Sequence, residues 1–245
     1  MTIKRTIVFT SFILWLLSQA ANAFGETVTD YYPLNDGNTW TYRVTGPLGV
    51  YQETDTVLPG TTLINGIQTK EIINTGTPDG DVYLYRSNDA HGIKTHAEYL
   101  PLSNIPPTWL IYKPPLILAN ATMNIGQIIN SNGEAKFIID GYGTFILNYE
   151  LTIKLESIET VVVPAGTYEA VKLSYSDRIY GYLLGEWFDF RSTEENWVAK
   201  YVGWVKGVYQ DSDGIETREL ISTNVTPPPA KPKSPFLPFL PLLLD

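Results

Sequence analysis

The stretch FILNYELTIKLE, residues 145–156, decides the fold class of this chain. Its odd positions, from Phe145 to Leu155, all carry apolar side chains, and its even positions from Asn148 to Glu156 are all polar or charged. Side chains alternate between the two faces of a β-strand. This period of two therefore predicts a strand with one dry face and one wet face.

Alternating runs of the same kind recur on either side of this strand, at residues 40–44 and 171–175. Elsewhere stand pairs that accept the positive φ of tight hairpin turns: Asn65-Gly66, Asp79-Gly80, Asn132-Gly133 and Asp213-Gly214. No window of about a dozen residues combines the period and the caps of a helix. We therefore predict an all-β protein with an antiparallel, strongly curved sheet, half-barrel or sandwich-like, and little helix.

The segment of residues 100–118 interrupts these patterns. It contains five prolines, which remove backbone donors and oppose a central strand. We predict an irregular loop that covers the inner face of the sheet as a lid, with Trp109 at the mouth of a ligand site. The alternative is that the same side chains plug one end of the barrel or sandwich. The apolar residues that would contact a ligand are Ile105, Trp109, Leu110, Ile111 and Tyr112.

The first residues of the chain have the three regions of a secretory signal peptide. Lys4 and Arg5 provide the positive charge, residues 7–17 the apolar segment, and Ala21 and Ala23 the small residues that signal peptidase accepts. We expect cleavage near Ala23 and export to the periplasm or the cell exterior. The apolar segment is shorter than the roughly 20 residues of a membrane span, so we expect no transmembrane span in the mature chain.

After the signal peptide of residues 1–23, the chain divides into two parts. Residues 24–226 are interpreted as a single β domain, and residues 227–245 as a proline-rich disordered tail. An alternative for the tail is a segment that docks on a partner or on a membrane interface.

The composition restricts the chemistry that this protein can perform. The net charge of −9 becomes about −11 when Lys4 and Arg5 leave with the signal peptide. The Lys and Arg residues are scattered along the chain, so we expect no nucleic-acid partner. Because the chain contains no cysteine, disulfides, thiol nucleophiles and cysteine-bound metals are excluded. We expect no cofactor.

No catalytic motif assigns a reaction to this protein. The sequence lacks the Gly-x-Ser-x-Gly elbow, the His-Glu-x-x-His zinc motif and a phosphate-binding glycine loop. His91 and His96 have the odd separation that places them on opposite faces of a strand, so we expect no metal site. We predict a protein that is not an enzyme. A secreted hydrolase is a third alternative, because four acidic residues could supply a glycosidase pair: Glu186, Asp189, Glu194 and Glu195.

Three motifs resemble those of a group of exported β-rich bacterial proteins and lipoproteins. They are YPL at 32–34 with GNTWTY at 37–42, VPAGTYEAV at 163–171, and WVA at 197–199 with GWVK at 203–206. The resemblance covers most of residues 31–223 and implies export without implying an activity. The lipid-attachment cysteine of many relatives is absent here. The VPAGT element is also similar to one in the periplasmic lipoprotein carriers, whose half-barrel sheet holds acyl chains on its concave face.

Two functional classes follow from these observations. The leading prediction is an exported, non-catalytic envelope protein that binds a lipid or another apolar or amphipathic small molecule on the inner face of its sheet. The alternative is a structural or protein-interaction component whose partners are envelope proteins. A deep apolar cavity would favour the first class. A cleft with converging carboxylates of perturbed pKa would instead favour a hydrolase.

Overall fold

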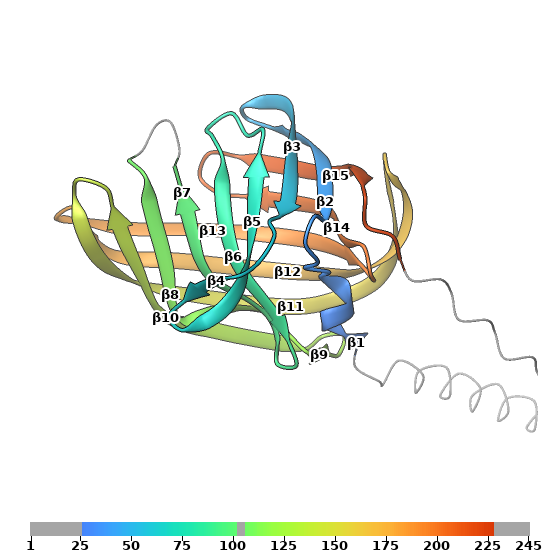
Figure 1. The fold of residues 1–245 in the computed structure, drawn as a ribbon, viewed down its shortest axis with the longest axis horizontal. Coiled ribbons are helices and arrows are strands. Elements are labelled where there is room, and N and C mark those ends of the chain that lie inside the picture. Colours follow the sequence, from blue (N-terminus) through green and yellow to red (C-terminus); the bar gives the residue numbers. More distant parts are fainter. Residues whose placement is uncertain (1–25, 102–105, 228–245) are drawn as a thin grey trace, which may run out of the picture.

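The protein is a closed antiparallel β-barrel (Figure 1). The computed structural model describes residues 26–101 and 106–227. Within these ranges, twelve strands follow one another around a single sheet, which closes where β3 pairs with β5. The predicted all-β fold with a strongly curved antiparallel sheet is confirmed. The curvature is large enough to join the two edges of the sheet, which leaves fewer backbone groups unpaired.

The described residues form strands of 2 to 21 residues and one 3-10 helix of 4 residues. They are β1 (Glu26–Thr27), η1 (Val28–Tyr31), β2 (Thr39–Gly46), β3 (Gly49–Val57), β4 (Thr62–Ile64), β5 (Ile67–Thr75), β6 (Val82–Asp89), β7 (Gly92–Leu100), β8 (Thr108–Asn120), β9 (Thr122–Met123), β10 (Ile128–Ile139), β11 (Gly143–Val163), β12 (Gly166–Leu183), β13 (Glu186–Ala199), β14 (Gly203–Gln210) and β15 (Ile215–Thr223). Around the barrel, β3 is followed by β2, by β15 down to β10, and then by β8 down to β5. β4 pairs with β5, and β1 pairs with β9. Among the described residues, no helix has the length and apolarity that crossing a membrane requires.

β11 has the alternation that the opening stretch predicts. Leu147, Leu151 and Leu155 point into the barrel and are buried, whereas Asn148 and Thr152 are exposed on the outer face. The pattern confirms that one face of this strand is dry. It also fixes the register of β10 and β12, which pair with β11 on either side.

Most of the predicted turn pairs do join neighbouring strands. Asn65 and Gly66 both have positive φ between β4 and β5, and Gly80 and Gly214 have positive φ in the turns after β5 and β14. The prediction for Asn132-Gly133 is wrong, because this pair lies inside β10. Gly133 is needed there for close approach: an added Cβ would lie 2.5 Å from the carbonyl oxygen of Lys113.

The prediction of an irregular loop over residues 100–118 is wrong for most of its length, because Thr108–Asn120 forms β8. β8 pairs with β10 as far as Lys113, and its pairing with β7 stops after Ile111 and resumes at Leu116. Pro114 and Pro115 lie in this interruption, where no ladder hydrogen bond requires their missing N–H groups. A strand therefore accommodates both prolines at an irregularity in its pairing.

The barrel interior contains two apolar clusters. The larger one surrounds Tyr31, Tyr32 and Trp40 and is closed by η1, which lies beside β1 and β9 at the lower right of Figure 1. Trp40 is buried, and its Nε1 donates to the carbonyl of Val202 at 2.6 Å, as expected of a core indole. The second cluster consists of Leu110, Tyr112, Ala135, Phe137, Leu147 and Tyr149.

Several sequence predictions lie outside the described residues. The signal peptide of residues 1–23 is one of them, as is the proline-rich tail from residue 228 onward. Both stay predictions.

Candidate functional site

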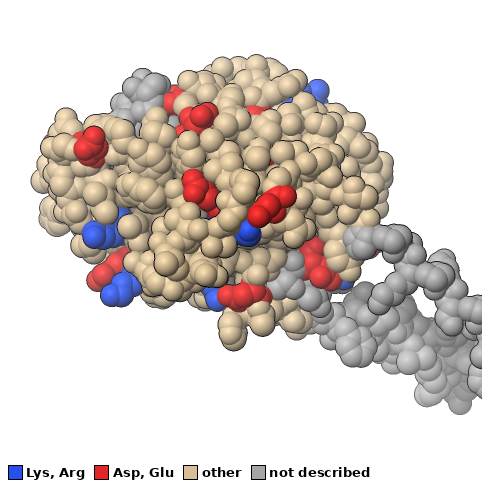
Figure 2. Space-filling model, viewed as in Figure 1, with Lys and Arg blue, Asp and Glu red and all other residues tan. Residues whose placement is uncertain are grey.

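A cavity of about 800 Å³ lies inside the barrel, bordered by both apolar clusters. Drug-sized ligands occupy pockets of roughly 300 to 1,000 Å³, so this volume suits a small molecule. The outer surface shows no comparable concentration of one kind of side chain on the face in Figure 2, where acidic and basic residues are scattered. The interior is therefore the strongest candidate for a functional site.

Part of the cavity lining is apolar. Inward positions of β7, β8, β10, β12 and β13 supply it, because strand geometry sends every second side chain into the barrel. Its side chains include Leu100, Leu110, Leu116, Phe137, Ile179, Phe188 and Phe190.

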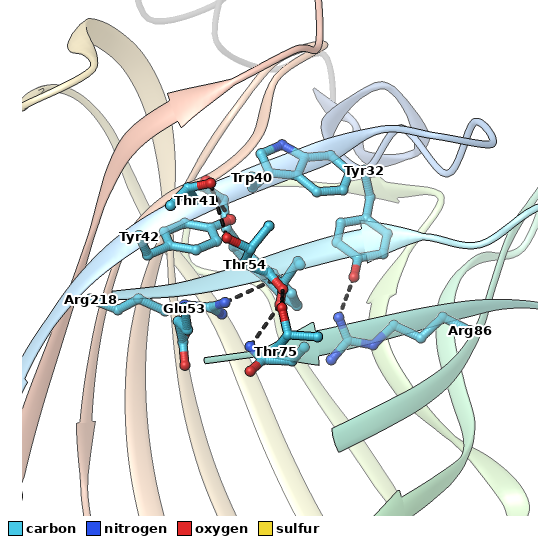
Figure 3. A network of polar contacts seen from close by, with 12 residues as sticks. Tyr32, Trp40, Thr41, Tyr42, Glu53, Thr54, Thr75, Arg86 and Arg218 are labelled. Atoms are coloured by element: carbon cyan, nitrogen blue, oxygen red, sulfur yellow. Dashed lines mark hydrogen bonds and ion pairs between the residues drawn. The ribbon is translucent and has the colours of Figure 1, made fainter. Parts of the chain in front are cut away.

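The polar part of the lining centres on a buried ion pair (Figure 3). The Arg218 guanidinium forms ion pairs with Glu53 and with Asp55, the latter at 2.9 Å, and lies 3.8 Å from the ring centroid of Tyr42. Glu53 and Asp55 are 7% and 5% exposed. Although burial acts to lower it, the charges of Asp55 and Glu53 raise the pKa of Arg218. The arginine therefore stays charged and is the counter-charge that both carboxyl groups share, although one positive charge balances only one carboxylate.

A second arginine, Arg86, is also buried beside the cavity. Its Nε donates to the Thr95 hydroxyl at 3.2 Å and its Nη1 donates to the Tyr32 hydroxyl (Figure 3). The guanidinium also lies 4.7 Å from the ring centroid of Trp204, within reach of a cation–π interaction. Although burial acts to lower the pKa of Arg86, interactions with Tyr32, Glu98 and Asp55 raise it.

Several carboxyl groups that face the cavity, among them Glu98, Asp177 and Glu194, have no arginine or lysine at ion-pair distance among the described residues. Burial raises the pKa of these three groups, because the enclosed site disfavours the charged form. Hydrogen bonds from Tyr112 to Glu98, from Ser192 to Asp177 and from Asn196 to Glu194 oppose the rise. The charge of Asp177 adds to the rise at the other two carboxyls.

The predicted ligand-binding residues divide between the two faces of β8. Leu110 and Tyr112 line the cavity. Trp109 and Ile111 point to the other side, where they pack on an outer cluster with Tyr85 and Ala97. The Trp109 ring stacks on that of Tyr85, with 5.2 Å between the ring centroids, and neither side chain is part of the cavity lining. Ile105 is outside the described residues.

The acidic residues that were considered as a glycosidase pair are also separated. Glu194 faces the cavity, whereas Asp189 pairs with Arg178 and Glu195 with Lys172 at the outer surface. Glu186 is exposed. Within residues 26–101 and 106–227, no group of three or more His, Asp or Glu residues is arranged to hold a metal ion.

The sequence interpretation missed the polar lining. Arg86, Glu98, Asp177 and Arg218 occupy inward positions of their strands, but charged residues in a strand usually indicate a wet outer face. Glu98 lies two residues before Leu100 on β7, so both side chains are expected on the same face of that strand. This spacing predicts that Glu98 points inward only once the inward face of β7 is known.

No protein-family model and no curated protein matches the chain. Two solved structures are similar to it. One is a predicted lipoprotein from Parabacteroides distasonis, 15% identical, with a TM-score of 0.48 and coverage of 79% of this chain and 97% of that chain. The other is a predicted exported protein with a YmcC-like fold from Bacteroides fragilis, 13% identical, with a TM-score of 0.40 and coverage of 78% and 97%. At these values neither similarity decides the fold or the function of this chain.

Proposed function

We propose that this protein is an exported, non-catalytic binding protein that holds an amphipathic small molecule inside its barrel. The observation that carries the proposal is the cavity of about 800 Å³, whose lining combines apolar side chains such as Leu110, Phe137 and Phe188 with charged ones such as Arg86 and Glu98. A lining of mostly apolar walls with a few convergent polar groups is typical of small-molecule sites. A purely structural component would need no such interior volume.

Titration with the neutral fluorescent probe N-phenyl-1-naphthylamine tests this function. We expect saturable binding with a Kd below about 100 μM, which corresponds to at least roughly 5.5 kcal/mol of binding free energy. The variant Ile179→Trp fills the apolar side of the cavity and should weaken binding at least about tenfold. Its matched control is Ile146→Trp on the outer face of the neighbouring strand, where the side chain is exposed and the affinity should not change. Absence of saturation in the wild-type protein would refute the function.

A secreted hydrolase is the second candidate, because Glu98, Asp177 and Glu194 all face the cavity. A glycosidase pair requires a protonated acid beside a carboxylate that stays ionised. Burial shifts the pKa of all three groups in the same direction, whereas a glycosidase needs two environments that move the pKa values of its acid and its second carboxyl apart. Release of nitrophenol from nitrophenyl glycosides, lost in both Glu98→Gln and Asp177→Asn, would support the hydrolase. No release at all is the result that the binding function predicts.

A further inference from the structure

The polar side of the cavity has an excess of acidic groups. Two arginines of the lining, Arg86 and Arg218, lie among the lining carboxyls Asp55, Glu98, Asp177 and Glu194, and Glu53 pairs with Arg218 without lining the cavity itself. Asp79, Glu150 and Asp211 also border the cavity. The two remaining basic side chains of the lining have partners at the outer surface. Arg178 pairs with Asp189, and Lys206 lies 5.1 Å from the ring centroid of Trp197. The electrostatic potential inside the cavity is therefore set by carboxyls.

The two arginines leave little capacity for an anion. Glu53 and Asp55 neutralise Arg218 directly. Arg86 donates to Tyr32 and Thr95, and Trp204 lies 4.7 Å from its guanidinium. The charges of Glu98 and Asp55 also act on Arg86. An anionic group in the cavity would have to compete with these partners and would meet the repulsion of the remaining carboxyls.

An independent observation indicates that a hydrogen-bond donor is missing. Asn74 lines the cavity and is only 9% exposed. Its Nδ2 donates to Asp55 at 2.7 Å, but its Oδ1 has no hydrogen-bond partner among the described residues. A buried acceptor without a hydrogen-bond partner destabilises the protein, so a ligand that donates a hydrogen bond to this oxygen would be favoured.

The walls of the cavity also suit a cation. Tyr42, Tyr112, Tyr175, Tyr209 and Trp204 all contribute to the lining. Tyr42 and Trp204 already hold guanidinium groups at 3.8 and 4.7 Å from their rings. Aromatic rings attract cations more strongly where the cation is desolvated, as it would be among these buried side chains.

We infer that the ligand of this cavity is an amphipathic amine, with a protonated nitrogen held among Glu98, Asp177 and Glu194 and an apolar arm against Leu110 and Phe137. The inference rests on the proposed function and specifies the class of ligand. An ammonium group supplies both the positive charge and the N–H donors that the cavity lacks. Its apolar arm would pack on the second apolar cluster, whose Leu110 lies opposite Glu98 in the pairing of β7 with β8.

Calorimetric titration with three ten-carbon probes tests the inference: decylamine, which is protonated at neutral pH, decanol and decanoate. We expect decylamine to bind at least about tenfold more tightly than decanol, equivalent to about 1.4 kcal/mol, and decanoate to bind most weakly. Glu98→Gln and Glu194→Gln should each weaken decylamine binding at least about fivefold and leave decanol binding unchanged. Glu134→Gln, on the exposed face of β10, is the matched control and should change neither affinity.

Each outcome distinguishes the ligand class from the function. Equal binding of decylamine and decanol, or tighter binding of decanoate, would overturn the amine and leave the binding function in place. Unchanged decylamine affinity in both glutamine variants would overturn the carboxyl site. Failure of every probe to bind would overturn the proposed function itself. If a glutamine variant does not fold, the order of the three probes on the wild-type protein still decides.

Discussion

The two ends of the barrel interior differ in the kind of side chain that faces inward. Around Tyr31, Tyr32 and Val198, apolar side chains fill the space and leave a cavity of only about 20 Å³, room for about one water molecule. Around Arg86 and Glu98, charged side chains face a cavity of about 800 Å³. The same sheet encloses both regions, so the difference comes from the inward side chains alone.

This contrast separates stability from function within one fold. Dense apolar packing stabilises the native state, whereas buried charges and empty volume reduce its stability. The closed end therefore has to offset the cost of the cavity. A protein selected only for stability would not keep five carboxyls and two arginines inside its barrel.

The largest loss of stability is expected from a substitution at the closed end of the barrel, the region around Tyr31, Tyr32 and Trp40 that apolar side chains fill. Trp40→Ala removes a buried indole and its hydrogen bond to Val202, and should lower the free energy of unfolding by about 4 kcal/mol. Urea unfolding measures this loss. Trp187→Ala, at an exposed tryptophan on β13, should cost less than about 0.5 kcal/mol. Similar losses for both variants would show that the closed end is not the main source of stability.

A smaller effect is expected at the buried ion pair. Arg218→Met leaves Glu53 and Asp55 without their counter-charge and should cost about 3 kcal/mol. The loss should shrink in acid, because Glu53, whose pKa is raised by burial, can then be protonated. Its matched control is Arg43→Met at the exposed pair with Glu219, for which a cost below about 1 kcal/mol is expected. Chemical unfolding of both variants at several pH values decides between these outcomes.

The smallest effect is a gain in stability. Because burial raises the pKa of Glu98 above its ordinary value of 4.5, the wild-type protein loses stability as the pH rises through the folded-state pKa. Glu98→Gln does not titrate and should therefore melt at a higher temperature than wild type at pH 8. The difference should vanish as the pH falls toward 4.5. A melting difference that is independent of pH would show that Glu98 is not destabilised in its charged form.

The sequence predicts the strands better than the site, for physical reasons. The alternation of β11 is local, and the positive φ of Asn65 and Gly66 follows from the residues themselves. β8 was missed because its prolines are tolerated only where pairing with β7 is interrupted, and Gly133 on another strand makes room for it. Such a requirement involves residues far apart in the chain.

The polar lining of the cavity was not predicted, for a related reason. Its side chains lie on inward positions, and inward and outward become defined only when β3 pairs with β5 and the sheet closes. Before closure, a charged residue such as Arg86 or Arg218 is indistinguishable from a surface residue. Leu110 and Tyr112, which were predicted to contact a ligand from a loop, line the cavity from β8, and their contact with a ligand stays a prediction.

Methyl NMR of isoleucine-labelled protein is the most direct test of ligand binding inside the barrel, because it shows whether a ligand lies inside or outside. Ile179 lines the cavity, whereas Ile146 is exposed on the outer face of the neighbouring strand. On addition of N-phenyl-1-naphthylamine, we expect saturable changes in the methyl chemical shifts of Ile179 and no change in those of Ile146. Shifts at Ile146 with an unchanged Ile179 would contradict binding inside the barrel.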